Sequence, residues 1–408
     1  MSEENGGVVI SMNKVMVSGH LCIDIIPEIN NMQSYNNFIK PGSLNHVGPI
    51  QMKTGGVVSN TGIALKKMGM DVLLNGKIGD DHLGQIIRNI LKEYYTGAGI
   101  RIAKGEASSY TIVLAPPGVD RILFHNPGAN DTFSIDDVDF EGMEDISLFH
   151  FGYPPLMKKM YKEDGDNLIN IFKEVGKRGV ITSLDMALPD PASESGKINW
   201  TSFLKNILPY VDIFAPSIEE ITFMVMPKIY HDYMMSNHGL DFIKQVNGSF
   251  IQELSSALLE WGAGIVLLKC GIKGIYIRTG NEERLSRASM DKLVDLKKWS
   301  DREIWIPAFL CKNILSTAGA GDCAIAGFLT AFLRGLEIEK AASCSAVLGY
   351  QNLFAADAYS GIKDWEETMK IIQENNLTQY TLDNMPKGWI FEEEIKIWIG
   401  PNDTKQCE

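Results

Sequence analysis

The amino-acid sequence predicts an α/β protein with a doubly wound, mostly parallel sheet flanked by helices. Short apolar segments alternate with helical patterns along the whole chain, which is the order that parallel strands joined by crossover helices require. Several segments are apolar at nearly every position, as expected of strands buried on both faces. We expect strands at Val15–Ser18, Val72–Asn75, Leu148–Phe151, Val180–Leu184, Val211–Ala215, Ile265–Lys269 and Gly274–Arg278.

Two of the expected helices are marked by the glycines that follow them. Val58–Met68 precedes Gly69, and Asp322–Arg334 precedes Gly335. Glycine is common directly after a helix because it adopts the left-handed conformation that ends one. In a doubly wound sheet, ligands bind at the carboxyl ends of the strands, so functional residues are expected there.

Two segments depart from this alternation and predict a small separate sheet. Residues 28–54 and 103–128 contain alternating apolar and polar positions, and a turn at Pro116–Asp120 would join two strands as a hairpin. Both segments lead into glycine-rich loops, so we expect this sheet to act as a lid over a site. The larger domain would then comprise 13–27, 55–102 and 129–370, followed by a C-terminal extension at 371–408.

Three other stretches are interpreted from composition. Residues 225–250 and 281–310 lack clear periodicity and are expected to be surface excursions. The extension contains the apolar runs Trp389–Phe391 and Ile395–Ile399, so we expect it to pack on the body or on a partner.

Charge and composition exclude several classes of function. The chain of 408 residues is 45% hydrophobic with a formal net charge of −13, which argues against a nucleic-acid-binding surface. The six cysteines show no paired or metal-type spacing and are expected to be reduced thiols of a cytoplasmic protein. No apolar run approaches 18 residues and no signal pattern is present, so we expect no membrane association.

The segment Ser316–Asp322 carries the strongest chemical signal in the chain. Its small residues allow a tight turn in which backbone N–H groups converge, and the following helix adds its positive end to the same point. This arrangement predicts an anion hole with the carboxylate of Asp322 at its rim. A carboxylate there could deprotonate a hydroxyl that attacks a neighbouring phosphate; the alternative is an Asp favoured only by the helix dipole.

A second group of residues suits a polyol. Paired glycines at Gly55 and Gly56 let a ligand approach the backbone, and Asn60 offers both a donor and an acceptor. Asp24, after the first expected strand, could accept from two hydroxyls. The alternatives are an ordinary helix start and a loop Asp that caps its own backbone.

Together these motifs resemble the ribokinase-like (PfkB) family of sugar and nucleoside kinases over roughly residues 13–370. Gly55-Gly56…Asn60, followed by Gly76–Gly84, is similar to the N-terminal signature, and Thr317–Asp322 is similar to the C-terminal signature. Phe124–Asn130 is similar to the segment that leaves the lid in many members. The resemblance implies the family's fold and an ATP- and magnesium-dependent reaction.

The resemblance also implies roles for individual residues. Asp322 would be the base, and the N–H groups of Gly319, Ala320 and Gly321 would stabilise the transferring phosphoryl group. The acceptor would be held by Asp24, Gly55, Gly56 and Asn60, with the lid residues Ser109, Thr111, Phe124 and Asn126 nearby. The nucleotide site would contain Lys269, Gly271, Gly274, Ser217 and Thr317; without the resemblance, Lys269–Gly274 would be read as a simple hairpin turn.

Two positions depart from the family pattern. Ser217 replaces the usual Asn of Asn-x-x-Glu, whose Glu, here Glu220, would organise magnesium; Ser-x-x-Glu is also a helix capping box, and both interpretations can hold. Ser316 replaces an Asp in a region associated with monovalent-cation activation, which leaves potassium dependence open.

The sequence therefore predicts an ATP-dependent kinase that phosphorylates a hydroxymethyl group of a small sugar or sugar acid. The alternatives are a nucleoside kinase on the same fold and a non-catalytic sugar- or nucleotide-binding regulator. We also expect a homodimer through the lid, because a small isolated sheet has an exposed apolar face and free edges.

Overall fold

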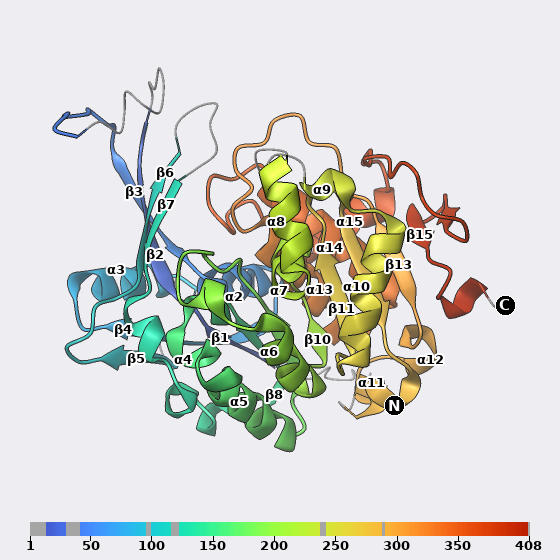
Figure 1. Cartoon of the computed structure of the whole chain (residues 1–408), viewed down its shortest axis with the longest axis horizontal. Helices are drawn as coiled ribbons and strands as arrows, with labels where there is room; N and C mark the ends of the chain where they lie inside the picture. The colour runs from blue at the N-terminus through green and yellow to red at the C-terminus, as the bar shows by residue number, and fades with distance from the viewer. Residues whose placement is uncertain are drawn as a thin grey trace, which may run out of the picture.

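A large sheet of eleven strands forms the centre of the molecule in the computed structural model (Figure 1). The structure describes residues 14–29, 41–94, 99–115, 122–236, 242–287 and 290–406. The strand order is β14-β15-β13-β12-β11-β10-β9-β8-β1-β4-β5. In chain order these strands are β1 (Lys14–Gly19), β4 (Asp71–Gly79), β5 (Ile100–Ala103), β8 (Ile146–Gly152), β9 (Ile181–Asp185), β10 (Ile213–Phe214), β11 (Ile265–Lys269), β12 (Ile275–Thr279), β13 (Glu303–Ile306), β14 (Ile390–Glu392) and β15 (Ile397–Ile399).

The sheet is mostly parallel, as the sequence predicts. In the spatial order, all neighbouring strands from β11 to the β5 edge pair in parallel. On the other side of β11, strands β12, β13, β15 and β14 continue the sheet with antiparallel pairing. All seven expected strands are present. The strands that were not expected, β5, β13, β14 and β15, lie toward the two edges of the sheet, and each has only three or four residues.

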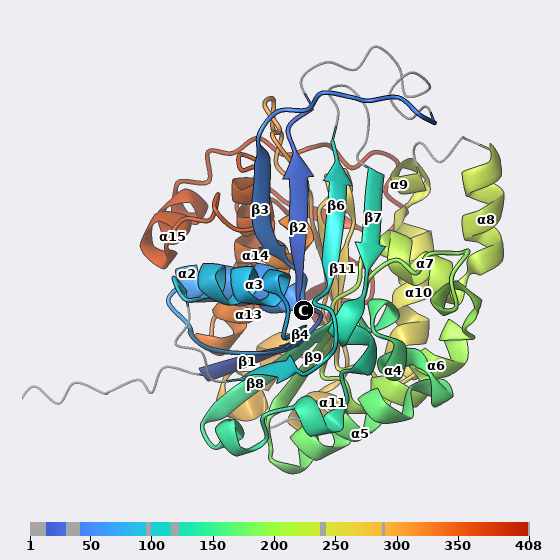
Figure 2. The ribbon, with the colours of Figure 1, turned by 90° about the vertical axis from the view of Figure 1, so that its left-hand side faces the viewer.

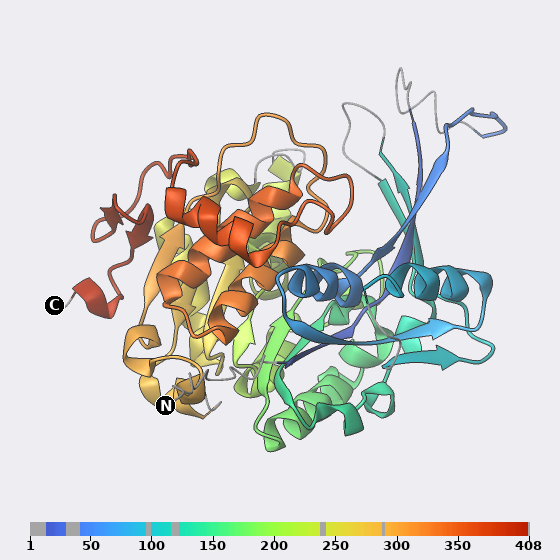
Figure 3. The same cartoon turned by 180° about the vertical axis from the view of Figure 1, so that it is seen from behind.

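Helices cover both faces of the sheet, so the fold has three layers. Side chains alternate between the layers: Val15 and Val17 belong to one core cluster, and Met16 between them belongs to the other. The first face, in front in Figure 3, carries α2, α3, α13, α14 and α15. The second, in front in Figure 1, carries α4, α5, α6, α7 and α10.

The helices that border the site or build these layers have the following bounds: α2 (Val57–Lys67), α3 (His82–Leu91), α4 (Lys158–Tyr161), α5 (Asp166–Lys177), α6 (Trp200–Ile207), α7 (Ile218–Val225), α8 (Pro227–Ser236), α9 (Phe242–Gln245), α10 (Gly248–Glu260), α11 (Glu282–Ser286), α12 (Leu296–Trp299), α13 (Ala320–Leu333), α14 (Ile338–Asn352) and α15 (Trp365–Glu374). The two helices marked by glycines are α2 and α13. Gly69 and Gly335, which follow them, have φ of 81° and 72°.

A second sheet of four strands stands against one end of the large sheet (Figure 2). Its order is β3 (Ile50–Gly55), β2 (Cys22–Pro27), β6 (Tyr110–Leu114) and β7 (Ile122–Asn126). The expected lid sheet is present, but it also takes in β2, which lies before the expected start at residue 28. The reason is a break at His20–Leu21, where the chain leaves β1 and turns into the small sheet. The expected turn at Pro116–Asp120 lies outside the described residues.

The C-terminal extension packs on the body of the protein. Strand β15 pairs with β13, and the buried guanidinium of Arg302 bonds Asp403 at 3.0 Å and Glu339 at 2.7 Å. This arrangement also corrects the expectation that 281–310 is a surface excursion, because Trp299 and Trp305 in that stretch are among the most buried side chains. Its apolar positions are spread over α12 and β13, so no single periodicity was visible.

No helix in the described part of the chain is long and apolar enough to cross a membrane. The five cysteines of that part are unpaired, and four of them are buried. Cys407 lies outside it.

Candidate active site

The candidate site forms where the carboxyl ends of several parallel strands meet the start of α13. Ser18 and Gly19 end β1, Asp185 ends β9 and Lys269 ends β11. The strand order reverses between β1 and β8, which is the kind of switch point where doubly wound sheets bind ligands. The four-stranded sheet rises beside this edge, as Figure 2 shows.

The expected anion hole has the backbone geometry that it requires. Gly319 has φ of 72° and is the N-cap of α13, and a Cβ at this position would lie only 2.3 Å from the Cβ of Ala358. The Ala320 N–H already donates to the carbonyl of Thr317 at 3.3 Å. Within the described residues, the N–H groups of Gly319 and Gly321 have no partner. These two amides and the helix dipole are therefore available to an anion.

The loop before α13 is held by its own polar groups. The amide of Asn352 donates to the carbonyl of Ala318 at 2.6 Å, and the Ser316 hydroxyl accepts from the Ala318 N–H at 3.0 Å. Ser316, which departs from the family pattern, therefore shapes the anion-hole loop. Thr317 is exposed beside it.

Asp322 lies in the first turn of α13 and is 6% exposed. Its carboxylate accepts three side-chain hydrogen bonds. Thr61 and Tyr153 donate to Oδ1 at 3.1 and 2.6 Å, and Asn60 donates to Oδ2 at 3.1 Å. The structure therefore brings Asn60, expected at the acceptor, directly to the expected base. Within the described residues, the Asn60 Oδ1 has no hydrogen-bond partner.

Tyr153 and Thr61 are site residues that the sequence analysis missed. Tyr153 follows β8 directly, at the carboxyl end of an expected strand, and the positional rule for doubly wound sheets could have singled it out. Thr61 follows Asn60 on α2 and carried no motif of its own.

A buried charge cluster lies beneath the anion hole. The Lys269 Nζ bonds the Asp185 Oδ1 at 2.5 Å, with the two side chains 11% and 1% exposed. A Cβ on Gly321 would lie 3.8 Å from the same Nζ. Lys269 was expected at the nucleotide, and Asp185 was not singled out.

Burial shifts the titration of this cluster. It raises the pKa of Asp185 to about 8, although Lys269 opposes the rise. Burial also raises the pKa of the nearby Glu220, again against Lys269. Burial lowers the pKa of Lys269, but Asp185 and Glu220 outweigh it, so this pKa ends above its ordinary value. In this cluster, two carboxyl groups therefore face a single lysine.

Ser217 and Glu220 form the capping box that their spacing allows. The Ser217 N–H donates to the Glu220 Oε2 at 2.7 Å, and the Glu220 N–H donates to the Ser217 Oγ at 3.2 Å. Glu220 also belongs to the buried charge cluster. The capping box therefore does not prevent Glu220 from binding magnesium.

Asp185 and Glu220 fit the chemistry of a magnesium site. Both supply oxygen ligands, and a bound cation would favour their ionised forms, which burial disfavours. In the part of the chain that the structure describes, no three potential ligands converge on one point. A magnesium ion would therefore be held by one or two carboxylates together with phosphates and water, as is common for this ion.

The expected nucleotide turn is a tight hairpin between β11 and β12. Gly271 and Gly274 have φ of 53° and 87°, and a Cβ on Gly274 would lie 2.0 Å from the carbonyl oxygen of Ile306. The Cys270 N–H donates to the Gly274 carbonyl at 2.7 Å. Both the functional interpretation and the simple-turn alternative are compatible with this geometry.

The glycines of the acceptor segment are required by close contacts. A Cβ on Gly55 would lie 2.6 Å from the Asp24 Oδ2, so the carboxylate of Asp24 lies directly over this glycine. Gly56 has φ of 85° and is the N-cap of α2. A Cβ on Gly56 would likewise clash with the carbonyl oxygen of His20. Asp24, Gly55 and Gly56 are therefore together, as the sequence predicts.

The face of the small sheet that turns toward the site carries a polar row. His125, Thr111, Asp24 and Lys53 occupy matching positions on β7, β6, β2 and β3. The Thr111 Oγ1 lies 3.1 Å from the Nδ1 of His125. His125 and Lys53 are additions to the residues that the sequence identified.

His125 also joins the small sheet to the body of the protein. Its Nε2 lies 3.3 Å from the Nε2 of His20, in the segment that connects β1 to β2. Burial, and then the neighbouring His125, hold the pKa of His20 well below its ordinary value. Burial also lowers the pKa of His125. The pair is therefore neutral near pH 7, and one ring can donate to the other.

Two expected lid residues do not face this polar row. Phe124 and Asn126 alternate with His125 along β7 and lie on the opposite face. Phe124 is 51% exposed and continues an apolar row formed by Ile112, Ile25 and Met52, of which Ile25 and Met52 pack against the core. Ser109 is buried, and its hydroxyl donates to the carbonyl of Asn126 at 2.8 Å. Because side chains alternate along a strand, Phe124 and Asn126 lie on the opposite face from Thr111, although the sequence analysis had placed all three at the acceptor.

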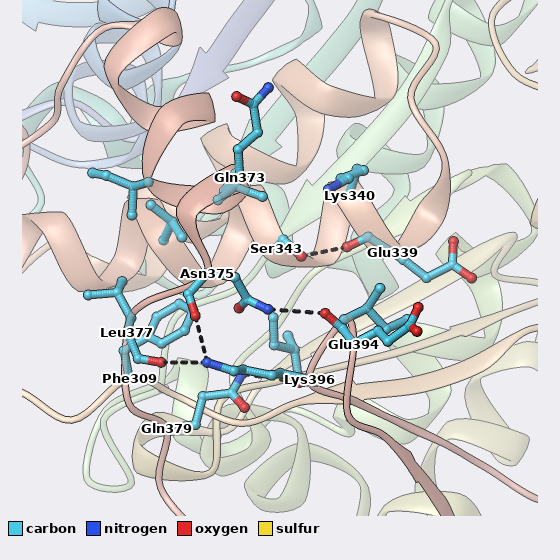
Figure 4. Close-up of a pocket in the computed structure, with 15 residues that line it drawn as sticks. Phe309, Glu339, Lys340, Ser343, Gln373, Asn375, Leu377, Gln379, Glu394 and Lys396 are labelled. Atoms are coloured by element: carbon cyan, nitrogen blue, oxygen red, sulfur yellow. Dashed lines mark hydrogen bonds between the residues drawn. The ribbon is translucent and has the colours of Figure 1, made fainter.

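A cavity of about 140 Å³ lies elsewhere, between α14, α15 and the C-terminal extension (Figure 4). Lys396 lines the cavity and donates to the carbonyls of Asn375 and Leu377. None of the predicted site residues lines this cavity.

Comparisons with known proteins agree with this architecture. Residues 12–364 match the pfkB family of carbohydrate kinases. A protein of Archaeoglobus fulgidus named "Uncharacterized sugar kinase" is 24% identical over 279 residues, which cover 68% of this chain and 89% of the relative. "Probable fructokinase-6, chloroplastic" of Arabidopsis thaliana is 26% identical, and the alignment spans only 52% of each chain.

A solved structure shares the fold. The ribokinase of Arabidopsis thaliana, in complex with ribose and ATP, superposes with a TM-score of 0.65 at 18% identity and covers 88% of this chain and 98% of its own. The fold has a ribokinase-like architecture, and the family match shows an ATP-dependent phosphotransferase. The chain belongs to the pfkB family of carbohydrate kinases.

Proposed function

We propose that this protein transfers the terminal phosphoryl group of ATP to a hydroxymethyl group of a small sugar or sugar acid. The observation that carries the proposal is the position of Asp322. Its carboxylate lies in the first turn of α13, next to the N–H groups of Gly319 and Gly321, and it accepts from Asn60 of α2, the helix whose N-cap is Gly56. A protein that only bound a ligand would gain nothing from a carboxylate next to an anion hole.

The proposed reaction assigns one step to each part of the site. The acceptor lies against Asp24 and Gly55 of the small sheet, with its hydroxymethyl group toward Asp322. Asp322 takes the hydroxyl proton as the oxygen attacks the phosphoryl group, and the amides of Gly319 and Gly321 stabilise the charge that develops there. Most of the rate gain would come from positioning and electrostatic stabilisation.

The nucleotide would lie over the Lys269–Gly274 turn and the loop before α13. Exposed apolar side chains border this region, among them Ile272, Leu315 and Phe354, and they offer a surface for an adenine base. When bound, magnesium would neutralise phosphate charge, with Glu220 and Asp185 as its protein partners. The related ribokinase structure contains ATP, which supports ATP as the nucleotide of the proposed reaction.

The acceptor is proposed from the chemistry of the polar row. Asp24, Thr111 and His125 offer hydrogen-bonding groups at adjacent positions, which suits a ligand with several hydroxyl groups. Phe124, the aromatic side chain that could have stacked on a base, lies on the outer face. This placement favours a free sugar over the alternative acceptor, a nucleoside.

A coupled ADP-release assay tests the proposal with a panel of pentoses, hexoses, sugar acids and nucleosides. We expect acceptor-dependent ADP formation with at least one sugar or sugar acid. Asp322→Asn should lower turnover about 10²- to 10⁴-fold and leave ATP affinity unchanged. Activity with nucleosides alone would show that the acceptor is a nucleoside. If no compound of the panel gives ADP formation while ATP still binds, the result would support a non-catalytic regulator.

A further inference from the structure

The two oxygens of the Asp322 carboxylate are used unequally. Oδ1 accepts from the phenol of Tyr153 at 2.6 Å and from the Thr61 hydroxyl at 3.1 Å. Among the described residues, Oδ2 accepts from Asn60 alone, at 3.1 Å. A carboxylate oxygen can accept about two hydrogen bonds, so Oδ1 is filled and Oδ2 keeps a free lone pair.

The backbone holds Tyr153 in a conformation that needs support. Its φ is 67°, in the left-handed region that side chains other than glycine rarely adopt. Such a residue persists only where its surroundings enforce it, and these conformations gather at functional sites. Here the Leu156 N–H donates to the Tyr153 carbonyl at 2.9 Å, and the Tyr153 N–H donates to the Asp185 carbonyl at 3.4 Å.

The surroundings of Tyr153 keep its phenol a donor. Its ring lies 5.9 Å from that of His20. Burial, and then the negative charge of Asp322, raise the pKa of the phenol well above its ordinary value. The phenol therefore remains protonated and faces Asp322 with its O–H.

We propose that Tyr153 is the positioning residue that selects Oδ2 of Asp322 as the oxygen that takes the acceptor's proton. This inference rests on the proposed kinase function. With Oδ1 filled by Tyr153 and Thr61, the carboxylate cannot rotate freely, and its free lone pair stays on the oxygen beside Asn60. The phenol itself transfers no proton.

The test is the pH dependence of kcat/KM for Tyr153→Phe, with the acceptor found in the ADP-release assay. Donors to Oδ1 favour the ionised carboxylate, so losing one should move the acidic limb of the profile to higher pH by about one unit. At its optimum, kcat should fall about tenfold because the carboxylate is less well oriented. The KM for ATP should not change.

Two further variants make the test specific. Thr61→Val removes the longer bond to the same oxygen and should move the acidic limb in the same direction by a smaller amount. Tyr161→Phe is the matched control, since Tyr161 is also buried and follows Tyr153 by eight residues but contacts Trp200 instead of Asp322. It should leave the pH profile unchanged.

The outcomes separate this inference from the proposed function. An acidic limb at the same pH in wild type and Tyr153→Phe would overturn it, even if the variant were slower or less stable. Equal shifts in Tyr153→Phe and Tyr161→Phe would also overturn it. If the wild-type protein shows no acceptor-dependent ADP formation, the proposed function fails first, and this inference falls with it.

Discussion

Replacing Lys269 by Met should destabilise the protein strongly, and more so at high pH. The substitution keeps a similar apolar stem against Gly321 but removes the ammonium that bonds Asp185 at 2.5 Å. Asp185 is 1% exposed, so water cannot replace the lost partner. Removing one member of a buried ion pair costs about 3–5 kcal/mol.

The pH dependence follows from the pKa of Asp185. Burial raises this pKa to about 8, against an ordinary value of 3.8. For a carboxyl group with a raised folded pKa, the stability it contributes is present at low pH and is lost as the pH rises through that folded value. Without Lys269 the folded pKa rises further, so the loss caused by the substitution should be larger at pH 9 than at pH 6.

The measurement is thermal unfolding at these two pH values. A chain of 408 residues unfolds with an entropy of about 0.9 kcal/mol/K. A loss of about 3–5 kcal/mol at pH 9 therefore corresponds to a Tm lowered by about 4–6 °C. The control is Lys298→Met, which removes an ion pair of similar length, 2.6 Å, whose two side chains are 56% and 58% exposed. This exposed pair should leave Tm unchanged within error.

Equal Tm losses for Lys269→Met and Lys298→Met would refute this reasoning, because burial would then not decide the energy of the pair. A loss for Lys269→Met that shrinks between pH 6 and pH 9 would contradict the direction assigned to Asp185. Adding Asp185→Asn to Lys269→Met should recover part of the stability at pH 9, since the buried carboxylate that bonded Lys269 is then absent.

Two further predictions concern magnesium and assembly. Glu220→Gln should raise the magnesium concentration that gives half-maximal rate; a small drop in Tm without that change would mean that Glu220 only caps α7 with Ser217. The protein should form a homodimer through the outer face of the small sheet, where Ile50 and Phe124 are 54% and 51% exposed. Light scattering should give twice the monomer mass, and Phe124→Lys should reduce it; a monomeric wild type at micromolar concentration would contradict the prediction.

Local signals in the sequence were enough for the sheet and for the ends of the key helices. Buried parallel strands are apolar along their whole length, and helix ends require particular residues such as Gly69. The same logic located the loop before α13, because glycine readily adopts a positive φ such as that of Gly319. Short strands such as β13 and β15 were not predicted, since three or four residues show no reliable period.

The sequence by itself therefore determined the α/β class, the loop at the start of α13 and the placement of Asp322 at its rim. These features depend on a few neighbouring residues and on backbone geometry. The tertiary structure decided which distant groups meet there: Tyr153 and Thr61 on one oxygen of Asp322, Lys269 on Asp185, and His125 on His20. It also turned Phe124 away from the site. Such contacts depend on strand order, register and the face of each strand, and these are fixed only when the separate segments pack together.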